Sequence, residues 1–252
     1  VDRLPVQRRR LSVRGRVQGV GFRPTVWNLA SELGLTGFVR NDGGGVTIEV
    51  QGPEERLEAF ETKLPQRLPP QAALHALQAR EIPVDSEPGF RILKSTARGQ
   101  GALLPPDLAT CADCLSELHD QADRRFGYPF LNCTNCGPRY TIVTALPYDR
   151  ERTTMQSFAL CSECKSEYES PADRRFHAQP TACPRCGPQL SMPVEAIKQR
   201  LDQGQVLAIK GVGGYHLICQ AENEAAVTRL RALKHRPDRP LALMVNDPAE
   251  WL

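Results

Sequence analysis

Eight of the nine cysteines of this chain stand in four C-x-x-C pairs on a regular grid. The gap from 114 to 133 equals the gap from 164 to 183, and the gap between them, from 136 to 161, is longer. The pentapeptide Ala-Asp-Arg-Arg-Phe recurs with the same offset as the cysteines, at 122–126 and 172–176. An offset shared by the cysteines and the residues between them indicates one supersecondary unit used twice. The pairs are Cys111/Cys114, Cys133/Cys136, Cys161/Cys164 and Cys183/Cys186.

This cysteine pattern predicts zinc. A C-x-x-C turn directs two thiolates at one ion, and two such turns complete the tetrahedral set of four sulfurs that Zn²⁺ accepts. Because four thiolates leave no open coordination position, the predicted ions are structural. A disulfide framework is the first alternative, but x₂ spacing suits S–S geometry poorly and no secretory signal precedes the cysteines. An iron–sulfur cluster is the second, since four cysteines can also hold one.

The shorter gap inside each repeat favours local closure of each metal site. We therefore assign one ion to Cys111, Cys114, Cys133 and Cys136, and the other to Cys161, Cys164, Cys183 and Cys186. His119 and His177 do not stand at matching positions of the repeats and are not assigned as ligands. Each repeat is poor in aliphatic residues, so metal binding is expected to supply its folding energy, on the order of 10 kcal/mol per site.

Composition narrows the function classes. Lys and Arg number 32 against 29 Asp and Glu, and this net charge of +3 gives no strong case for nucleic acid. The basic excess is local, in an arginine cluster over residues 3–23, for which a solvated face or tail is the simplest interpretation. No apolar run approaches the length of a membrane span, roughly 18 residues. Thiol-rich pairs without a secretory signal predict a cytoplasmic protein. The chain starts at Val1 and stops inside a structured pattern, so we expect a fragment of something longer.

The segment 1–95 carries a pattern of alternating strands and helices. Apolar and polar residues alternate over 11–17, and Val26, Leu29 and Leu33 then recur at helical spacing up to Gly34. The predicted order is a strand at 11–17, that helix, strands at 35–40 and 46–51 joined by a turn at 41–45, a helix from Pro53, a strand at 74–82 and an edge piece at 90–93. This βαββαβ order predicts a ferredoxin-like sandwich of helices on an antiparallel sheet, and hence an α+β fold class.

The first strand-to-helix turn of this domain predicts an anion site. Gly19 and Gly21 allow consecutive backbone N–H groups to face inward, and a helix starts directly after them. Arg23 adds a planar guanidinium group, which can bind a phosphate through two parallel hydrogen bonds. By itself, a glycine-containing turn of this kind is more often only structural.

Two strings make the turn more specific. Val17-Gln18-Gly19-Val20-Gly21-Phe22-Arg23, followed by Gly37-Phe38-Val39-Arg40-Asn41, resembles the two signatures of the acylphosphatase family. The resemblance implies that Arg23 binds the substrate phosphate and that Asn41 orients the attacking water. It also implies that the backbone amides of Gln18, Gly19, Val20, Gly21, Phe22 and Arg23 cradle the phosphate. An acyl phosphate is already activated, so positioning and charge stabilisation can suffice for its hydrolysis.

After the cysteine repeats a third pattern begins. A helix is expected at 194–201, a buried strand at 206–209, a glycine loop at 210–217, a helix around 224–233 and a strand at 241–245. This segment resembles the beginning of a YrdC-type α/β domain, a family that forms carbamoyl adenylates from ATP. The resemblance implies a nucleotide-binding role for Lys210, Arg231, Lys234 and Arg236. The predicted domains are thus 1–95, acylphosphatase-like; 96–107, linker; 108–190, two zinc-finger repeats of four cysteines each; and 191–252, a truncated YrdC-like domain.

The order of the three parts resembles that of the hydrogenase-maturation carbamoyltransferases. The resemblance implies hydrolysis of carbamoyl phosphate at Arg23 and Asn41, ATP-dependent carbamoyl adenylate formation, and transfer to a cysteine of a HypE-type protein for the synthesis of cyanide ligands of [NiFe] hydrogenases. It adds ATP to zinc as a cofactor of the full-length enzyme. Two alternatives stay open: a zinc-ribbon module that binds nucleic acid, and a non-catalytic zinc scaffold. No membrane partner is expected.

Overall fold

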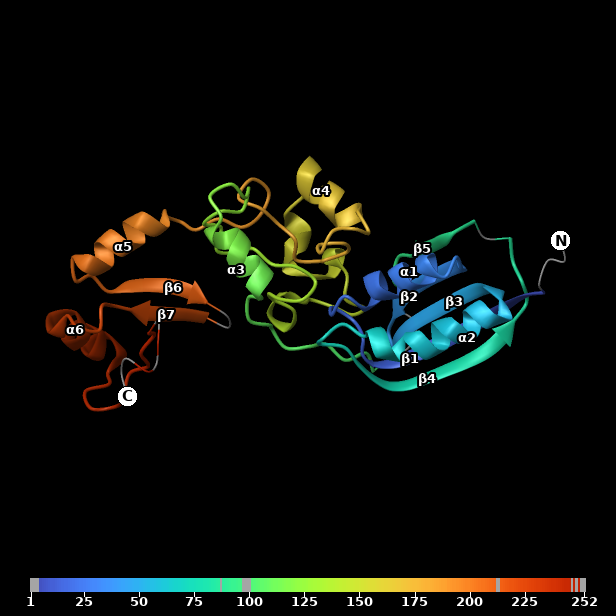
Figure 1. The fold of residues 1–252 in the computed structure, drawn as a ribbon. Helices are drawn as coiled ribbons and strands as arrows, with labels where there is room; N and C mark the ends of the chain where they lie inside the picture. Colours follow the sequence, from blue (N-terminus) through green and yellow to red (C-terminus); the bar gives the residue numbers. More distant parts are fainter. Residues whose placement is uncertain are drawn as a thin grey trace. The chain divides into compact units, whose positions relative to one another are not determined.

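The computed structural model describes residues 5–86, 88–96, 101–211, 214–245, 247 and 249. The chain divides into two compact units, Val1–Pro188 and Gln189–Leu252. The first unit holds the predicted acylphosphatase-like and cysteine-rich parts, which pack against each other, and the second holds the last four elements (Figure 1). Each unit is described by itself.

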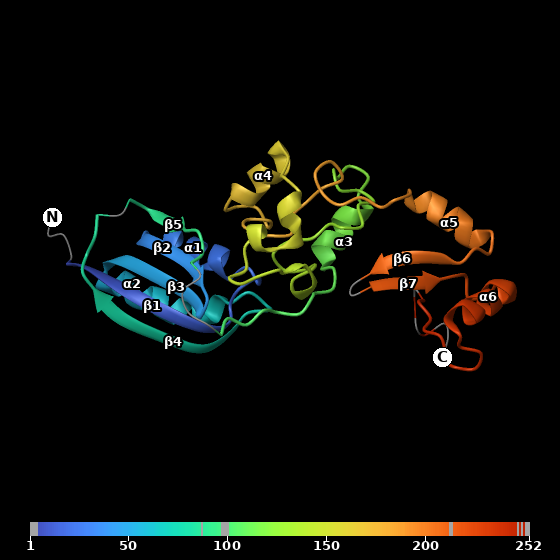
Figure 2. The ribbon, with the colours of Figure 1, turned by 180° about the vertical axis from the view of Figure 1, so that it is seen from behind.

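The N-terminal domain is a five-stranded sheet with two helices. Its elements are β1 (Val6–Arg16), α1 (Phe22–Glu32), β2 (Thr36–Asp42), β3 (Gly45–Pro53), α2 (Glu54–Lys63), the 3₁₀ turn η1 (Pro65–Arg67), β4 (Ala73–Ile82) and β5 (Phe90–Ile92). The strand order is β4-β1-β3-β2-β5, and β4 runs along the outer edge in both views (Figure 1 and Figure 2). The predicted βαββαβ order and the α+β class are confirmed.

The four strands of the βαββαβ order form the predicted antiparallel sheet, and the predicted edge piece adds a parallel strand to it. The pairs β1–β3, β1–β4 and β2–β3 are antiparallel, but β5 pairs with β2 in parallel. The chain reverses once after β4, so β5 runs in the direction of β1 and β2 and can add to the free edge of β2 only in that sense. The sheet is therefore mixed.

The side-chain pattern explains why these residues form this sandwich. On β3, Val46, Ile48 and Val50 are at most 1% exposed and meet Leu57 and Phe60 of α2, which are fully buried. On β1, Leu11 and Val13 face the same core, while four arginines of the cluster stand at alternate positions, namely Arg8, Arg10, Arg14 and Arg16. The cluster is not a free tail: Arg8 and Arg10 lie in β1 and both form ion pairs with Glu49, at 2.7 and 2.6 Å.

The cysteine-rich part consists of two short helices and loops. Helix α3 (Ala112–His119) follows Cys111 directly, and α4 (Ser162–Glu169) follows Cys161 in the same way. The two helices have equal length and stand at equivalent positions of the two repeats, as the sequence predicts. Between the repeats run three 3₁₀ turns, η2 (Tyr140–Ile142), η3 (Arg150–Arg152) and η4 (Thr154–Ser157). The buried core here contains more cysteine than aliphatic side chains.

The second unit contains α5 (Val194–Asp202), β6 (Leu207–Gly211), β7 (Gly214–Ile218) and α6 (Glu224–Lys234). Both predicted helices are present, but three details were wrong. The glycine loop is a hairpin whose second strand begins at Gly214. The run 206–209 is half-exposed, because the two-stranded sheet has little to pack against. Residues 241–245 form no strand, since neither β6 nor β7 pairs with them among the described residues. The predicted domain boundaries stay a prediction.

Candidate functional site

The strand-to-helix turn of the N-terminal domain has free backbone donors. Gly19 and Gly21 adopt the left-handed conformation, with φ of 70° and 79°, and Gly21 is the N-cap residue of α1. Among the residues that the structure describes, the amides of Gly19, Val20, Gly21, Phe22 and Arg23 have no hydrogen-bond acceptor. Unpaired amides at the start of an eleven-residue helix can bind an anion, as the sequence predicts, and their role in binding phosphate stays a prediction.

Arg23 and Asn41 converge on one oxygen atom. Nη2 of Arg23 lies 3.4 Å and Nδ2 of Asn41 lies 3.3 Å from the carbonyl oxygen of Tyr148. Both side chains are buried, at 7% and 0% exposure. The sequence-predicted pair is therefore brought together, from α1 and β2, closely enough to bind the same ligand atom. Oδ1 of Asn41 is buried without a hydrogen-bond partner in the described part of the chain. It can therefore accept a hydrogen bond from a water molecule.

A loop of the cysteine-rich part completes this site, and the sequence analysis did not predict it. Asp149 Oδ1 accepts a hydrogen bond of 2.9 Å from Nη1 of Arg23. The backbone N–H of Tyr148 donates to Oε1 of Gln18 at 2.9 Å, and Nε2 of Gln18 donates to the carbonyls of Asp42 and Gly45. The available signal was the middle gap between the cysteine pairs, from 136 to 161, which is longer than the gaps inside the repeats.

Arg139 links the cysteine pairs to the phosphate turn. Its side chain is 1% exposed, and it donates to the carbonyl of Gly19 and to four carbonyls of its own loop, those of Cys133, Thr134, Cys136 and Pro138. The repeat contains a hint of this role, because the second copy has Gln189 where the first has Arg139. Trp27 of α1 and Phe176 add an edge contact between the same two parts, with ring centroids 5.7 Å apart.

A small cavity of about 20 Å³ lies between the turn and the cysteine-rich part. Gly19, Gly21 and Arg23 line one side, and His177 and Gln179 are among the residues that line the other. This space suits one water molecule, so a larger anion must displace a side chain as it enters. Burial, reinforced by the nearby charge of Arg23, lowers the pKa of His177 to about 4, although Asp149 opposes the shift. His177 is therefore neutral at pH 7.

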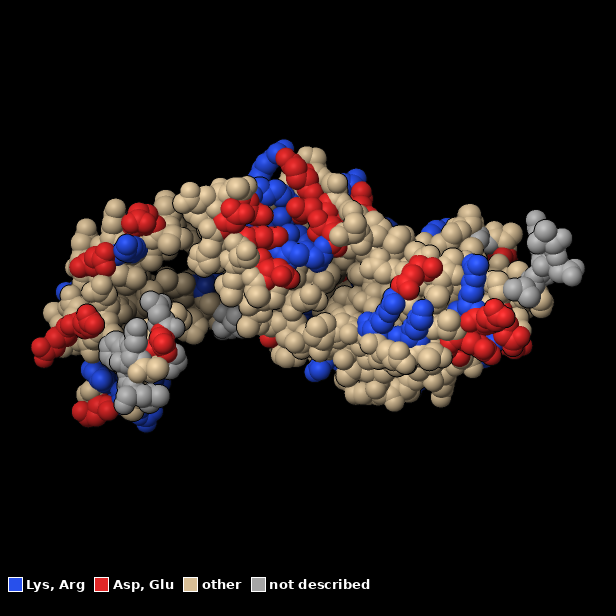
Figure 3. Space-filling view, viewed as in Figure 1, with Lys and Arg blue, Asp and Glu red and all other residues tan. Residues whose placement is uncertain are grey.

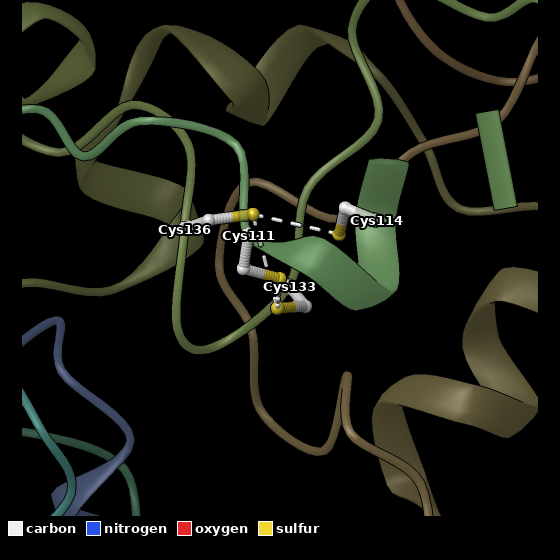
Figure 4. A group of neighbouring side chains, drawn as sticks. All are labelled: Cys111, Cys114, Cys133 and Cys136. Carbon is white, nitrogen blue, oxygen red and sulfur yellow. Dashed lines mark hydrogen bonds between the residues drawn. The ribbon is translucent and has the colours of Figure 1, made fainter. Parts of the chain in front are cut away.

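The two cysteine clusters have the geometry of tetrahedral metal sites. Each set of four sulfurs, Cys111/Cys114/Cys133/Cys136 and Cys161/Cys164/Cys183/Cys186, lies within 4.8 Å of one another. In the first set the closest sulfur pairs are 3.4 to 3.9 Å apart, and the four side chains point toward a common centre (Figure 4). Tetrahedral Zn–S bonds of about 2.3 Å place sulfurs about 3.8 Å apart. The donor set and its spacing fit zinc.

The repeated arginine pairs cross between the clusters. Arg124 and Arg125, of the first repeat, donate to Sγ of Cys164 in the second cluster, at 3.2 and 3.4 Å. Arg174, of the second repeat, donates to Sγ of Cys114 in the first cluster at 3.1 Å. In the sequence these arginines are recognisable only as part of the repeat. Their position shows that each repeat completes the surroundings of the other cluster.

Two glutamates neutralise the crossed arginines. Glu167 of α4 accepts from Arg124 and Arg125, and Glu117 of α3 accepts from Arg174 and Arg175. Figure 3 shows these opposite charges side by side over α3 and α4. Burial alone would raise the pKa of Glu117, but the hydrogen bonds from Arg175 and Arg174 outweigh it and lower the pKa to about 2.

The predicted nucleotide-binding residues lie on two parts of the second unit, with Lys210 on β6 and the other three in the last turns of α6 and directly after it. Nη1 of Arg231 donates to the carbonyls of Arg236, Pro237 and Arg239, which makes it a support of the loop after α6. Lys210 lies on β6 with its Nζ 5.9 Å from the ring centroid of Tyr215. Lys234 and Arg236 are exposed. Among the described residues, no hydrogen bond or ion pair joins Lys210 to the other three. Their role in binding ATP stays a prediction.

Comparisons with known proteins agree with this arrangement. Residues 9–92 match the family model described as acylphosphatase, 110–143 and 160–192 match the HypF finger, and 199–252 match the model described as telomere recombination. An acylphosphatase of Caldivirga maquilingensis is 43% identical over 86 residues, which are 33% of this chain and 90% of that protein. The N-terminal domain thus belongs to the acylphosphatase family, in a chain with HypF-type fingers.

Longer relatives match nearly the whole chain. The carbamoyltransferase HypF of Synechocystis sp. is 52% identical over 250 residues, 94% of this chain and 33% of its own length. A crystal structure of full-length HypF in the phosphate- and nucleotide-bound form shares 42% identity and a TM-score of 0.92, over 98% of this chain and 34% of that one. The chain is similar to HypF proteins over nearly all of its own length and spans about one third of the length of these relatives. Among the described residues, no helix is long and apolar enough to cross a membrane.

Proposed function

We propose that this chain hydrolyses an acyl phosphate, and that carbamoyl phosphate is the substrate. The observation that carries the proposal is the convergence of Arg23 and Asn41 on one oxygen, beside a turn whose amides have no acceptor among the described residues. In this arrangement the amides and Arg23 hold the phosphate, and Asn41 orients a water against the acyl carbon. No covalent intermediate is needed, because the acyl phosphate bond is already activated.

The two cysteine clusters would each hold a structural zinc ion. Four sulfurs per cluster leave no position for water or substrate, so the metal would fix the fold of the cysteine-rich part. That part supplies the loop carrying Tyr148 and Asp149 to the site. Zinc would thereby support hydrolysis indirectly. The match to HypF fingers favours this interpretation over a nucleic-acid-binding module.

Similarity to the HypF relatives, of which this chain covers about a third, supports a place in a wider reaction. Carbamate released at Arg23 would be adenylated with ATP by a YrdC-like domain, with Lys210, Arg231, Lys234 and Arg236 as the predicted phosphate-facing residues. The carbamoyl group would then pass to a cysteine of a HypE-type protein, as a precursor of cyanide ligands in [NiFe] hydrogenases. We place this sequence in the cytoplasm, where thiols stay reduced.

The test is phosphate release from carbamoyl phosphate by this chain. Arg23→Ala and Asn41→Ala should each lower kcat/KM about a hundredfold or more, as expected for the loss of a donor to developing charge. Arg14→Ala, which removes an exposed arginine of β1, is the matched control and should retain activity. Activity in folded, zinc-loaded Arg23→Ala within a few-fold of wild type would overturn the assignment.

A further inference from the structure

The loop between the two cysteine repeats holds the guanidinium of Arg23 from one side. Nη1 of Arg23 donates to Asp149 at 2.9 Å and to Oγ of Ser95 at 3.4 Å, and Nη2 donates to the Tyr148 carbonyl. Among the described residues, Nε of Arg23 has no hydrogen-bond partner. Nε and the second hydrogen of Nη2 are therefore free to bind a ligand together.

Arg23 also borders the cavity described above. Arg23 lines the cavity beside the unpaired amides of the turn, whereas Asp149 is not among the lining residues. A phosphate in the cavity would lie beside Arg23 and the backbone amides, whereas the Asp149 carboxylate stays outside the lining. The planar guanidinium suits this division, because its donors point in fixed directions and can bind two anions on different edges.

The loop that carries Asp149 is held by hydrogen bonds on both sides of this residue. This argues against a role in which Asp149 blocks the phosphate site and moves away when substrate binds. Before Asp149, Tyr148 is 1% exposed and its backbone N–H donates to Gln18. After Asp149, Arg150 donates to the carbonyls of Phe158, Gln179 and Thr181 at 2.6 to 2.9 Å, and its own N–H donates to Gln179. A carboxylate fixed on both sides is placed to orient Arg23 rather than to swing away from it.

We propose that Asp149 is a positioning residue of the acylphosphatase site, which anchors Nη1 of Arg23 so that Nε and Nη2 are presented to the substrate phosphate. The inference rests on the proposed function in that the phosphate belongs to an acyl phosphate. It implies that the HypF-type site is shared between two parts of the chain, with the arginine on α1 and its orienting carboxylate between the cysteine repeats. Asp149 itself does not touch the reacting atoms.

The direction in which Asp149→Asn changes the affinity for phosphate distinguishes a positioning role from a role in which Asp149 competes with phosphate for Arg23. Removal of a negative charge beside Arg23 should, by Coulomb's law alone, tighten the binding of a phosphate dianion. Loss of an anchor should weaken it. We expect Asp149→Asn in the zinc-loaded chain to raise both KM for carbamoyl phosphate and the inhibition constant of inorganic phosphate about tenfold. Asp149→Glu, which keeps the carboxylate, should recover part of that loss. Asp120→Asn, at an exposed aspartate that bonds its own loop, should change neither.

A double-mutant cycle separates positioning from a general effect on folding. In the Arg23→Ala background, Asp149→Asn should change kcat/KM less than twofold, because the anchored group is gone. Tighter phosphate binding by Asp149→Asn, unchanged kinetics, or effects that multiply with Arg23→Ala would each overturn the proposal. Calorimetric titration with inorganic phosphate provides the second readout. If wild type binds phosphate through Arg23 but hydrolyses no acyl phosphate, the proposed function fails while the role of Asp149 is still decided.

Discussion

Replacement of Glu167 by Gln tests the crossed arrangement of the cysteine repeats most directly. Glu167 is the carboxylate that neutralises Arg124 and Arg125, and the Arg125 side chain is only 1% exposed. Removing one partner of a buried ion pair costs roughly 3 to 5 kcal/mol, because the other charge stays buried and unpaired. The Glu167 side chain is 20% exposed, and Arg125 keeps its bonds to Cys164 and the Ala182 carbonyl. We therefore expect a loss of about 2 to 3 kcal/mol.

The assay is zinc release to a chromophoric chelator as urea is increased. With a slope of about 1.5 kcal/mol per M, a loss of this size lowers the midpoint of release by about 1 to 2 M. The second cluster should release its ion first in Glu167→Gln, and the first cluster in the mirror variant Glu117→Gln. To identify which cluster has lost its metal, the cysteines of one cluster are replaced and cobalt is bound at the other. The sulfur-to-cobalt charge-transfer absorption then reports the occupancy of that cluster alone.

Two controls make this result specific. Glu169→Gln removes a carboxylate two positions further along α4, whose partner Lys165 is as exposed as itself, and should leave the midpoint unchanged. Arg125→Gln should loosen the second cluster although Arg125 belongs to the first repeat. Were Arg125→Gln to loosen the first cluster instead, or Glu167→Gln to behave like Glu169→Gln, the crossed arrangement would not be what stabilises the metal sites.

Three further outcomes are expected. Chelation of zinc should abolish acyl-phosphate hydrolysis, because the Tyr148–Asp149 loop lies between the cysteine pairs; hydrolysis that survives full removal of zinc, measured with metal analysis, would contradict this. Gly21→Ala should weaken inorganic phosphate binding and cost about 1 to 2 kcal/mol in urea unfolding, since φ is 79° and the added Cβ would lie 3.3 Å from Thr134. His177 has a folded pKa of about 4 against an ordinary value near 6.5, so the unfolded chain binds more protons between these pH values and stability falls as pH is lowered through this window. Relative to His177→Asn, which tolerates the φ of 52°, wild type should lose about 3 kcal/mol between pH 7 and pH 4, and parallel unfolding curves would refute the assignment.

The sequence predicted correctly those elements that depend on residues close together in the chain. Alternation on β1 and β3, helical spacing on α1 and the glycines of the phosphate turn each follow from residues close together in the chain. The grouping of the eight cysteines also followed from their spacing, and the structure brings together the same two sets. The strands of the second unit were less predictable, since an apolar run such as 241–245 becomes a strand only if a neighbouring strand pairs with it.

Contacts between distant segments were beyond the sequence. Nothing in the strings around Arg23 or Asp149 indicates that these residues, 126 positions apart, share a hydrogen bond. The repeats themselves hide such contacts, because equivalent positions have different surroundings. Phe126 is 50% exposed, whereas Phe176, its counterpart in the second repeat, is 5% exposed against Trp27. A repeat predicts equal local structure, but only the tertiary arrangement decides which copy packs on the neighbouring domain.

The crossed clusters and the shared site have a common physical basis. A loop that orients Arg23 must keep its carboxylate close to one fixed position, and a segment with few aliphatic side chains cannot achieve this by packing. Here the loop is held through Arg139 and Arg150, which bind backbone carbonyls next to the cysteine pairs. Crossed arginines further tie each cluster to the other repeat. Metal bound at sites with no open coordination position would thereby determine the geometry of the proposed phosphate site on another part of the chain.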